Sequence, residues 1–162
     1  ERLLDMANYI LTSTDAHHID FERKRVDAYT IASIRLDNMK WPIYCRTSNK
    51  KIINPGDHCL IYIGGRKTLT GNIIALATVG NVVNDNTPVD SLDVLTGNPE
   101  RVLHFSDINR FEMPVNIKAV LNYLEFTPKN TKHWGVSLQG GCKKISDYDF
   151  NWIVNSRYNS IV

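Results

Sequence analysis

The sequence has no apolar run close to the roughly 18–20 residues that a helix needs to span a bilayer, so we expect no membrane segment. Nor does the beginning of the chain have the layout of a signal peptide, because acidic residues stand where the apolar core of such a peptide would be. We interpret residues 1–5 as a leader or a remnant of expression, and Met6 as a natural start. Residues 6–162 are expected to form a single domain, since no linker or repeat divides them.

Cysteine is scarce, and its three positions suggest no pairing. Cys45, Cys59 and Cys142 are far apart in the chain and form no CxxC motif, so neither a disulfide framework nor a thiolate zinc site is indicated. The adjacent His17 and His18 are interpreted as part of a polar loop, because neighbours on an extended chain point in opposite directions. We therefore expect no metal, no cofactor and a reducing, cytoplasmic environment.

Signatures of catalysis are absent too. The sequence contains no GxSxG, HExxH, P-loop or GxGxxG motif. Gly64-Gly65 and Gly140-Gly141 are typical of hairpins and strand ends. Cys142 is followed by Lys143, and a neighbouring cation can lower a thiol pKa, but the sequence offers no partner for such a nucleophile. We expect a domain that is not an enzyme and has no catalytic residue.

Charge of both signs is present but unevenly distributed. The net charge is only +2. Residues 40–67 contain six basic residues and one acid, Asp57, and residues 129–144 contain four lysines and no acid. Acids gather instead in an excursion over residues 85–100. Such segregation predicts a basic face that meets a polyanion, and the alternative is a chance clustering of surface lysines.

Residues 52–63 are interpreted as the centre of the fold. Asn54-Pro55-Gly56-Asp57 has the residue types of a tight turn. The apolar run Cys59–Ile63 then has the length and composition of a strand buried on both faces. Asn72–Val79 is a second such run, and the two are predicted to form a central antiparallel pair.

The rest of the chain predicts further strands around this pair and helices outside it. The expected strands are Asn8–Thr14, Trp41–Arg46 as an edge strand or structured loop, Arg101–Met113 with a break near residues 107–109 and an end at Pro114, and Lys132–Leu138. The expected helices are a short helix or turn early in residues 21–39 followed by irregular or extended chain, a turn of helix in residues 89–95, Asn116–Leu124, and a final helix beginning at Ser146. Asn116 and Ser146 are N-cap residue types, and Asp149 gives the last helix a capping-box pattern.

Aromatic residues are interleaved with basic residues in the two basic segments. Trp41 and Tyr44 stand close to Arg46 and Lys50, and Trp134 stands among further lysines. Basic residues attract phosphates, and flat aromatic rings stack on unpaired nucleobases at roughly 1–3 kcal/mol per ring. This pattern favours nucleic acid as the ligand. The alternative is that both tryptophans are core residues, as most tryptophans largely are.

The order of these motifs resembles the EVE domain of the PUA-like superfamily. That family has a first strand, a tryptophan-led basic segment, a proline-glycine-aspartate turn with its strand, a glycine-led strand, and a second tryptophan strand with a glycine turn and a last helix. The matching segments here are Tyr9-Ile10, Trp41 to Lys51, Ile53 to Tyr62, Gly71 to Val79 and His133 to Ile153. The departures are the insert over residues 21–39 and the acidic excursion.

The resemblance implies an α+β fold, a PUA-like mixed β pseudo-barrel with peripheral helices. It also implies a binding domain that flips a modified base, modified cytosine or adenine, into an aromatic pocket. The residues implied for the base pocket are Trp41, Trp134, Tyr44, Ser13, Thr12 and Asn49. Those implied for phosphate contacts are Arg46, Lys50, Arg66 and Lys143.

The predicted partner is therefore nucleic acid, with modified DNA favoured over RNA. The predicted setting is a modification-dependent restriction system with a fused or neighbouring nuclease. Three alternatives stay open: an RNA-binding PUA-like protein, a nuclease or amidohydrolase of the ASCH type, and a module that binds a protein or small ligand. The ASCH type needs lysine and glutamate together, and the chain has only five glutamates.

Overall fold

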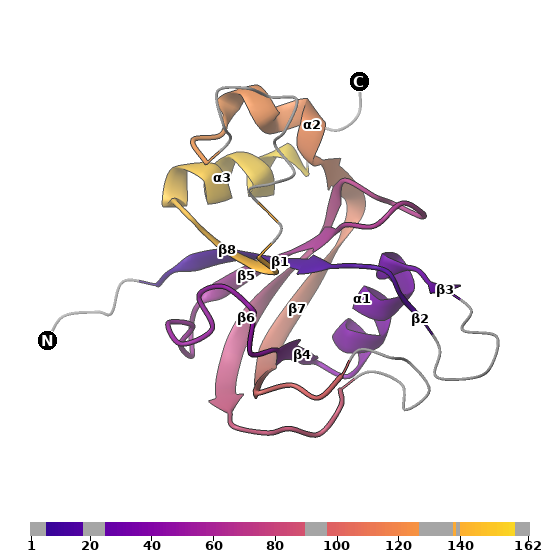
Figure 1. Ribbon diagram of the computed structural model, residues 1–162. Helices are drawn as coiled ribbons and strands as arrows, with labels where there is room; N and C mark the ends of the chain where they lie inside the picture. The colour runs from indigo at the N-terminus through magenta and orange to yellow at the C-terminus, as the bar shows by residue number, and fades with distance from the viewer. Residues whose placement is uncertain (1–5, 18–24, 90–96, 127–137, 139, 158–162) are drawn as a thin grey trace, which may run out of the picture.

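A computed structural model of the chain describes residues 6–17, 25–89, 97–126, 138 and 140–157 (Figure 1). Its strands are β1 (Asn8–Ser13), β2 (Ala16–His17), β3 (Arg25–Val26), β4 (Lys40–Ile43), β5 (His58–Ile63), β6 (Asn72–Val83), β7 (Arg101–Asn116) and β8 (Cys142–Ile145). Its helices are α1 (Ala28–Asp37), α2 (Ile117–Val120), the short 3-10 helix η1 (Leu121–Tyr123) and α3 (Asp147–Ser156). None of these described helices is long and apolar enough to cross a membrane.

Six of the strands form one mixed sheet in the order β4-β7-β6-β5-β1-β8. β1 and β5 run parallel, and every other neighbouring pair in this sheet is antiparallel. The sheet curls into a half-barrel, with α1 against one face and α2 and α3 against the other (Figure 1). β2 and β3 form a separate two-stranded ribbon. The predicted α+β class and mixed pseudo-barrel with peripheral helices are confirmed.

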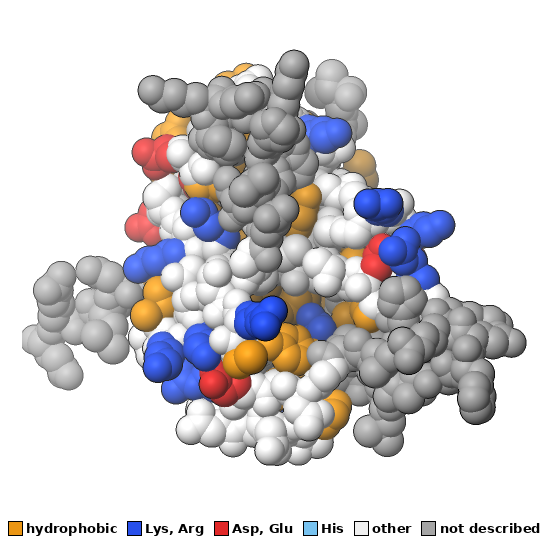
Figure 2. Space-filling model, in the orientation of Figure 1, with side chains coloured by type: hydrophobic (Ala, Val, Ile, Leu, Met, Phe, Trp, Pro, Cys, Tyr) orange, Lys and Arg blue, Asp and Glu red, His pale blue; other side chains and the backbone are white. Residues whose placement is uncertain are grey.

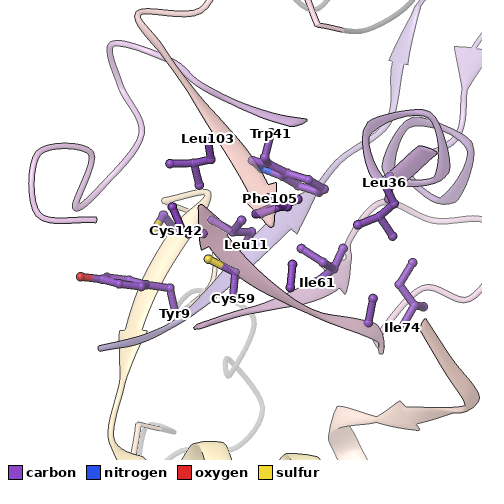
Figure 3. Packing of buried hydrophobic residues seen from close by; sticks show 14 of the residues in the cluster. Tyr9, Leu11, Leu36, Trp41, Cys59, Ile61, Ile74, Leu103, Phe105 and Cys142 are labelled. Carbon is purple, nitrogen blue, oxygen red and sulfur yellow. The ribbon is translucent and has the colours of Figure 1, made fainter. Parts of the chain in front are cut away.

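The two faces of the sheet bury two separate apolar clusters. In β1, Tyr9 and Leu11 belong to the cluster on the α1 side, shown in Figure 3, whereas Ile10 belongs to the cluster under α2 and α3. Because successive side chains of a strand point to opposite faces, a strand covered on both sides must be apolar throughout. β5 meets this condition, since Cys59 to Ile63 are all buried. The predicted central antiparallel pair is confirmed in β5 and β6.

The turn before β5 is held by the carboxylate of Asp57. It accepts hydrogen bonds from the backbone N–H of Ala7 (3.0 Å) and of Asn54 (2.8 Å). Gly56 has a φ of 93°, a backbone conformation that residues other than glycine rarely adopt. The turn therefore fixes both the entry into β5 and the chain just before β1.

β7 is longer than the sequence predicted and is continuous over its whole length. It runs through Pro114 to Asn116, and residues 107–109 pair with β6 without a break. The predicted end at Pro114 and the predicted break are therefore wrong. The ladder with β6 shifts register at three places. Two of them lie next to Val79, and the third lies where Val115 pairs with Ile73 but Arg110 pairs with Ala75. Pro114 falls inside this third shift and has no partner in the register, so its lack of an N–H costs the ladder no hydrogen bond.

The helix of the 21–39 segment comes late in it rather than early. The expected order, a helix or turn followed by irregular or extended chain, is wrong, because the described part begins with β3 and continues into α1. Asp27 starts the helix: its carboxylate accepts a hydrogen bond from Thr30 N–H (2.8 Å). Aspartate is a preferred N-cap residue, so this signal was present in the sequence.

The last helix begins as predicted. Ser146 Oγ accepts a hydrogen bond from Asp149 N–H (3.1 Å). The Asp149 carboxylate does more than a capping box requires: it is buried and accepts from the N–H groups of Glu125 (2.7 Å) and Phe126 (3.1 Å). It thereby ties the start of α3 to the chain that follows η1.

The helix predicted at Asn116–Leu124 is present as α2 continued by η1. Asn116 is its N-cap and accepts a hydrogen bond from Lys118 N–H (2.9 Å). The turn of helix predicted for residues 89–95 and the strand predicted for residues 132–138 lie outside the described residues, apart from the one residue at an end of each range.

Candidate nucleic-acid interface

A turn that contacts the C-terminal end of β1 also binds a loop rich in basic residues. Residues 44–51 are termed the basic loop, and Gly140-Gly141 the glycine turn. Thr12 N–H donates a hydrogen bond to the Gly141 carbonyl (2.9 Å), and Ser48 N–H donates to the Gly140 carbonyl (2.9 Å). The structure thus brings together segments that are far apart in the chain and that hold most of the predicted site residues.

The basic loop also closes the half-barrel. β4, which precedes the loop, lies at one edge of the sheet, and β8, which follows the glycine turn, lies at the other. The Ser48–Gly140 hydrogen bond and a second one, from Asn49 Nδ2 to the Cys142 carbonyl (3.0 Å), join these two edges. Because an open strand edge is a row of unpaired backbone groups, the loop protects β8 as well as positioning its own side chains.

Thr12 and Ser13, both predicted to read the edge of a base, point to opposite faces of the sheet. Thr12 Oγ1 donates to the carbonyl of Leu138 (3.2 Å), which belongs to the cluster under α2 and α3. Ser13 is fully buried, and its Oγ donates to the Ala28 carbonyl (2.7 Å) at the start of α1. The two hydroxyls therefore do not share one pocket, and Ser13 holds α1 against the sheet.

Two further predicted edge readers lie in the basic loop. Asn49 has a φ of 59°, a left-handed conformation that asparagine tolerates better than most residues. Its amide nitrogen is engaged with Cys142, as described above. Tyr44 is half-buried, and its N–H donates to Thr47 Oγ1 (2.9 Å). A role of Asn49 and Tyr44 in reading a base stays a prediction.

Trp41 lies in the core on the α1 side (Figure 3). Its exposure is 2%, and the Arg35 guanidinium carbon lies 4.7 Å from the centre of its ring. A ring covered in this way presents no open face to a nucleobase. The structure thus has Trp41 as a core residue, which is one of the two readings of its sequence pattern. Stacking on a base stays a prediction that requires this ring to be uncovered.

Trp134, the second predicted stacking residue, lies outside the described residues. The described chain resumes with Leu138, four residues later, which is buried and accepts the hydrogen bond from Thr12. The third tryptophan, Trp152 on α3, is 36% exposed and stacks on Tyr123 with ring centres 4.6 Å apart.

The four predicted phosphate contacts lie on three different parts of the fold. Arg46 in the basic loop and Arg66 in the β5–β6 turn are exposed, and Lys143 on β8 is half-buried. Lys50 is engaged: its Nζ donates to the Cys45 carbonyl (2.9 Å). Figure 2 shows Lys and Arg side chains on one face in several separate groups rather than in one continuous patch.

The acidic excursion is not separated from the basic loop in space. The Glu100 carboxylate forms an ion pair with Lys50 Nζ at 2.9 Å, and the pKa of Glu100 is lowered by this hydrogen bond and by the lysine charge. Arg101 ties the same region together, because its Nη1 donates to the Lys50 carbonyl (3.2 Å) and its Nε to Asn84 Oδ1 (3.2 Å). The charge segregation along the sequence therefore does not persist at Lys50.

The buried thiols have raised rather than lowered pKa values. Burial raises the pKa of Cys142 to about 12 and also raises that of Cys59. A lowered pKa for Cys142 is therefore wrong: the thiol is buried in the α1-side cluster, whereas Lys143 points to the other face of β8. Among the described residues, no group of three His, Cys, Asp or Glu side chains could hold a metal ion.

Asp15, just beyond β1, has a role that the sequence analysis missed. One carboxylate oxygen accepts a hydrogen bond from Ala28 N–H (2.9 Å), and the other lies 3.7 Å from Arg25 Nε. A Cβ on Gly65 would collide with the same carboxylate. Asp15 thus ties the end of β1 to α1 and packs closely against the turn that carries Arg66. Its partners are remote in the sequence, so no local pattern pointed to it.

Comparison with known proteins identifies the fold. No protein-family model matches the chain, and no curated protein matches its sequence. A hypothetical protein from Leishmania major matches its structure with a TM-score of 0.59 at 13% identity, over 98% of this chain and 98% of that chain. Protein Atu2648 from Agrobacterium tumefaciens matches with a TM-score of 0.52 at 12% identity, over 93% of this chain and 92% of that one.

A third match is the human THYN1 protein, solved in complex with 5-methylcytosine containing DNA. Its TM-score is 0.56 at 10% identity, over 93% of this chain and 97% of that chain. The chain has the EVE/PUA-like fold. The resemblance seen in the order of the sequence motifs is confirmed at the level of the fold, and the match spans nearly the whole length despite the two departures.

Proposed function

We propose that this EVE/PUA-like domain binds nucleic acid and holds one modified base, flipped out of its strand, at the C-terminal end of β1. Modified cytosine in DNA is the first candidate, followed by modified adenine. The observation that carries the proposal is the fold shared with the human THYN1 protein, whose structure is a complex with 5-methylcytosine containing DNA. The grouping of Thr12, the basic loop and the glycine turn at one end of β1 supports it.

Two requirements of base flipping are matched by residues of this chain. Extruding a base costs a few kcal/mol, which stacking and hydrogen bonds must recover. We assign the stacking ring to Trp134, because Trp41 is covered by Arg35 and the core. The exposed Arg46 and Arg66 supply positive charge from the basic loop and from the β5–β6 turn. Phosphate contacts of this kind make binding fall steeply with salt.

Discrimination by the mark alone is expected to be modest. A buried methyl group contributes about 1 kcal/mol, which corresponds to a roughly fivefold to tenfold preference. A larger preference requires that the unmodified base leave a polar group of the pocket without a partner.

We further propose that the domain is a reader rather than an enzyme, and that it serves a modification-dependent restriction system beside a nuclease. The state of the thiols supports the first part, because a buried cysteine whose pKa is about 12, as for Cys142, is a poor nucleophile. Turnover of any oligonucleotide during the binding assay below would contradict it.

The test measures binding to a panel of nucleic-acid probes by fluorescence anisotropy. The probes are one duplex carrying 5-methylcytosine, the same duplex carrying N6-methyladenine, the unmodified duplex, and RNA of the same sequence, each titrated at low and at moderate salt. We expect tightest binding to a modified duplex and a steep loss with salt. Trp134→Ala should weaken binding, whereas Trp152→Ala, at an exposed tryptophan on α3, should not. Absence of binding to every probe overturns the proposal, and binding to RNA alone moves the function to RNA.

A further inference from the structure

The basic loop and the glycine turn meet at a contact that only glycine permits. A Cβ on Gly140 would collide with Ser48 Oγ and lie 2.9 Å from Ser48 Cβ. Gly141 is required for a different reason: its φ is 81°, and the nearest atom to a Cβ there is Thr47 Cγ2 at 3.7 Å. Gly140 is therefore needed for space, and Gly141 for backbone conformation.

Three consecutive carbonyls, two in the glycine turn and one at the first residue of β8, hold two other segments. The Gly140 carbonyl accepts from Ser48 N–H (2.9 Å), and the Cys142 carbonyl accepts from Asn49 Nδ2 (3.0 Å). The carbonyl between them, of Gly141, accepts from Thr12 N–H (2.9 Å). The first and third of these carbonyls therefore hold the basic loop, and the second holds β1.

These contacts decide where the cations of the basic loop lie. Arg46 is exposed and stands two residues before Ser48, and Lys50 follows Asn49 directly. The later part of the loop has a second tether, since the Lys50 carbonyl accepts from Arg101 Nη1 (3.2 Å). The Ser48–Gly140 contact lies on the Arg46 side of that tether.

We infer that the Gly140–Ser48 contact and the Asn49 amide are positioning elements of the nucleic-acid interface. They hold Arg46 and Lys50 beside the end of β1, so that both cations meet the phosphates flanking the bound nucleotide. This inference rests on the proposed function and adds to it the parts that set the geometry of the loop. Gly140, Ser48 and Asn49 act through the loop and do not themselves contact the ligand.

The decisive test is Gly140→Ala with rescue by Ser48→Gly. The new methyl group pushes Ser48 away, so we expect the 5-methylcytosine duplex to bind about tenfold more weakly. The slope of log affinity against log salt concentration should also become shallower, by the amount that corresponds to about one lost phosphate contact. Ser48→Gly removes both colliding atoms, and the double variant should bind like Ser48→Gly alone. Gly141→Ala is the matched control: its strain is in φ, so Ser48→Gly should not rescue it.

Asn49→Gly tests the same inference if the Gly140→Ala variant does not fold. Glycine retains the left-handed φ and removes only the amide that reaches Cys142. We expect about fivefold weaker binding, the equivalent of ~1 kcal/mol for one hydrogen bond. The salt dependence should again become shallower, which loss of stability alone would not cause.

The outcomes separate this inference from the proposed function. If the parent protein binds the duplex but folded Gly140→Ala and Asn49→Gly bind equally well, the inference is overturned and the proposed function stands. Weakened binding that Ser48→Gly does not restore in the Gly140→Ala background also overturns it. If the parent binds no probe, the proposed function fails and the inference fails with it.

Discussion

The two ends of β1 are built in different ways. At its N-terminal end the buried carboxylate of Asp57 accepts two backbone N–H groups, from Ala7 and Asn54. At its C-terminal end neutral donors of the basic loop bind the carbonyls of the glycine turn, and Arg46 remains exposed. The first end fixes the backbone. The second end also fixes the backbone but leaves the Arg46 side chain exposed, whereas Lys50 is held by the Cys45 carbonyl and by Glu100.

The two ends of β1 are therefore expected to contribute differently to stability and to binding. Removing the hydrogen bonds of a buried carboxylate lowers the free energy of unfolding substantially, so substitutions in the Asp57 turn should destabilise the protein. Hydrogen bonds between a surface loop and a turn are individually modest, so the basic loop is adjustable at small cost. We expect substitutions at the first end to change stability most, and substitutions at the second end to change binding most.

The largest effect is expected for Trp41→Ala, in the core on the α1 side rather than at either end of β1. Removing a side chain that is 2% exposed leaves a cavity and uncovers Arg35, so we expect a loss of about 3–5 kcal/mol in the free energy of unfolding. Urea denaturation measures this. Trp152→Ala, at an exposed position, serves as control and should cost about 1 kcal/mol or less. A stable Trp41→Ala variant that no longer binds nucleic acid would instead place this indole in the pocket.

The next effect compares the carboxylates at the two ends. Asp57→Ala leaves two backbone N–H groups without their acceptor and should cost about 3 kcal/mol, with nucleic-acid affinity unchanged in the folded protein. Asp15→Ala removes the acceptor of one N–H group and loosens the turn carrying Arg66. It should cost about 1–2 kcal/mol and also weaken binding. Thermal unfolding measures the stability of both variants, and fluorescence anisotropy measures their nucleic-acid affinity. Equal affinities of the two variants would contradict the assignment of binding to the C-terminal end of β1 alone.

The two ends also differ in how far the sequence predicted them. The Asp57 turn was predicted because its residues are neighbours and proline, glycine and aspartate have local conformational preferences. The same holds for the central strands and for the Ser146 cap. The order of such local motifs sufficed for the fold, which the structural matches confirm.

The C-terminal end of β1 could be predicted only in part. Its segments were named from motifs, but the contacts of Thr12, Ser48 and Gly140 join residues that are remote in the chain, and nothing local encodes them. The alternation of strand side chains, which was applied to His17 and His18, would have separated Thr12 from Ser13 as well. The core position of Trp41 was one of the two interpretations of its sequence pattern, and its role in a base pocket came only from the resemblance to the EVE domain.

A smaller effect is expected at alkaline pH, from Tyr9 near the Asp57 end. Burial raises the pKa of Tyr9 from 10.0 to about 12, with a further contribution from the charge of Asp57. An acid whose pKa is higher in the folded state contributes its full stabilisation below the unfolded pKa and loses it as the pH rises to the folded one. Thermal stability should therefore decline between pH 10 and about 12. Tyr9→Phe should decline less steeply, and parallel curves for the two proteins would contradict this assignment.

The smallest effect is expected for Glu100→Gln at the basic loop, and it has the opposite sign from the others. The Glu100 carboxylate lies 2.9 Å from Lys50 Nζ, on a side chain that is 47% exposed. Such a surface pair adds little to stability, so the unfolding transition should not move. The pair nevertheless competes with a phosphate for the lysine. Glutamine keeps the shape and removes the charge, so the affinity for the modified duplex should rise about threefold at low salt, with a salt dependence steeper by up to about one contact.

Two further variants show whether this gain comes through Lys50. Glu125→Gln removes another exposed acid, beside the cap of α3, and controls for the change in net charge. Lys50→Gln should weaken binding and abolish the effect of Glu100→Gln when the two are combined. An equal gain from Glu125→Gln would mean that the protein responds only to its total charge. A gain in affinity that is specific to Glu100→Gln would mean that Glu100, in the acidic excursion, weakens nucleic-acid binding by competing with phosphate for Lys50.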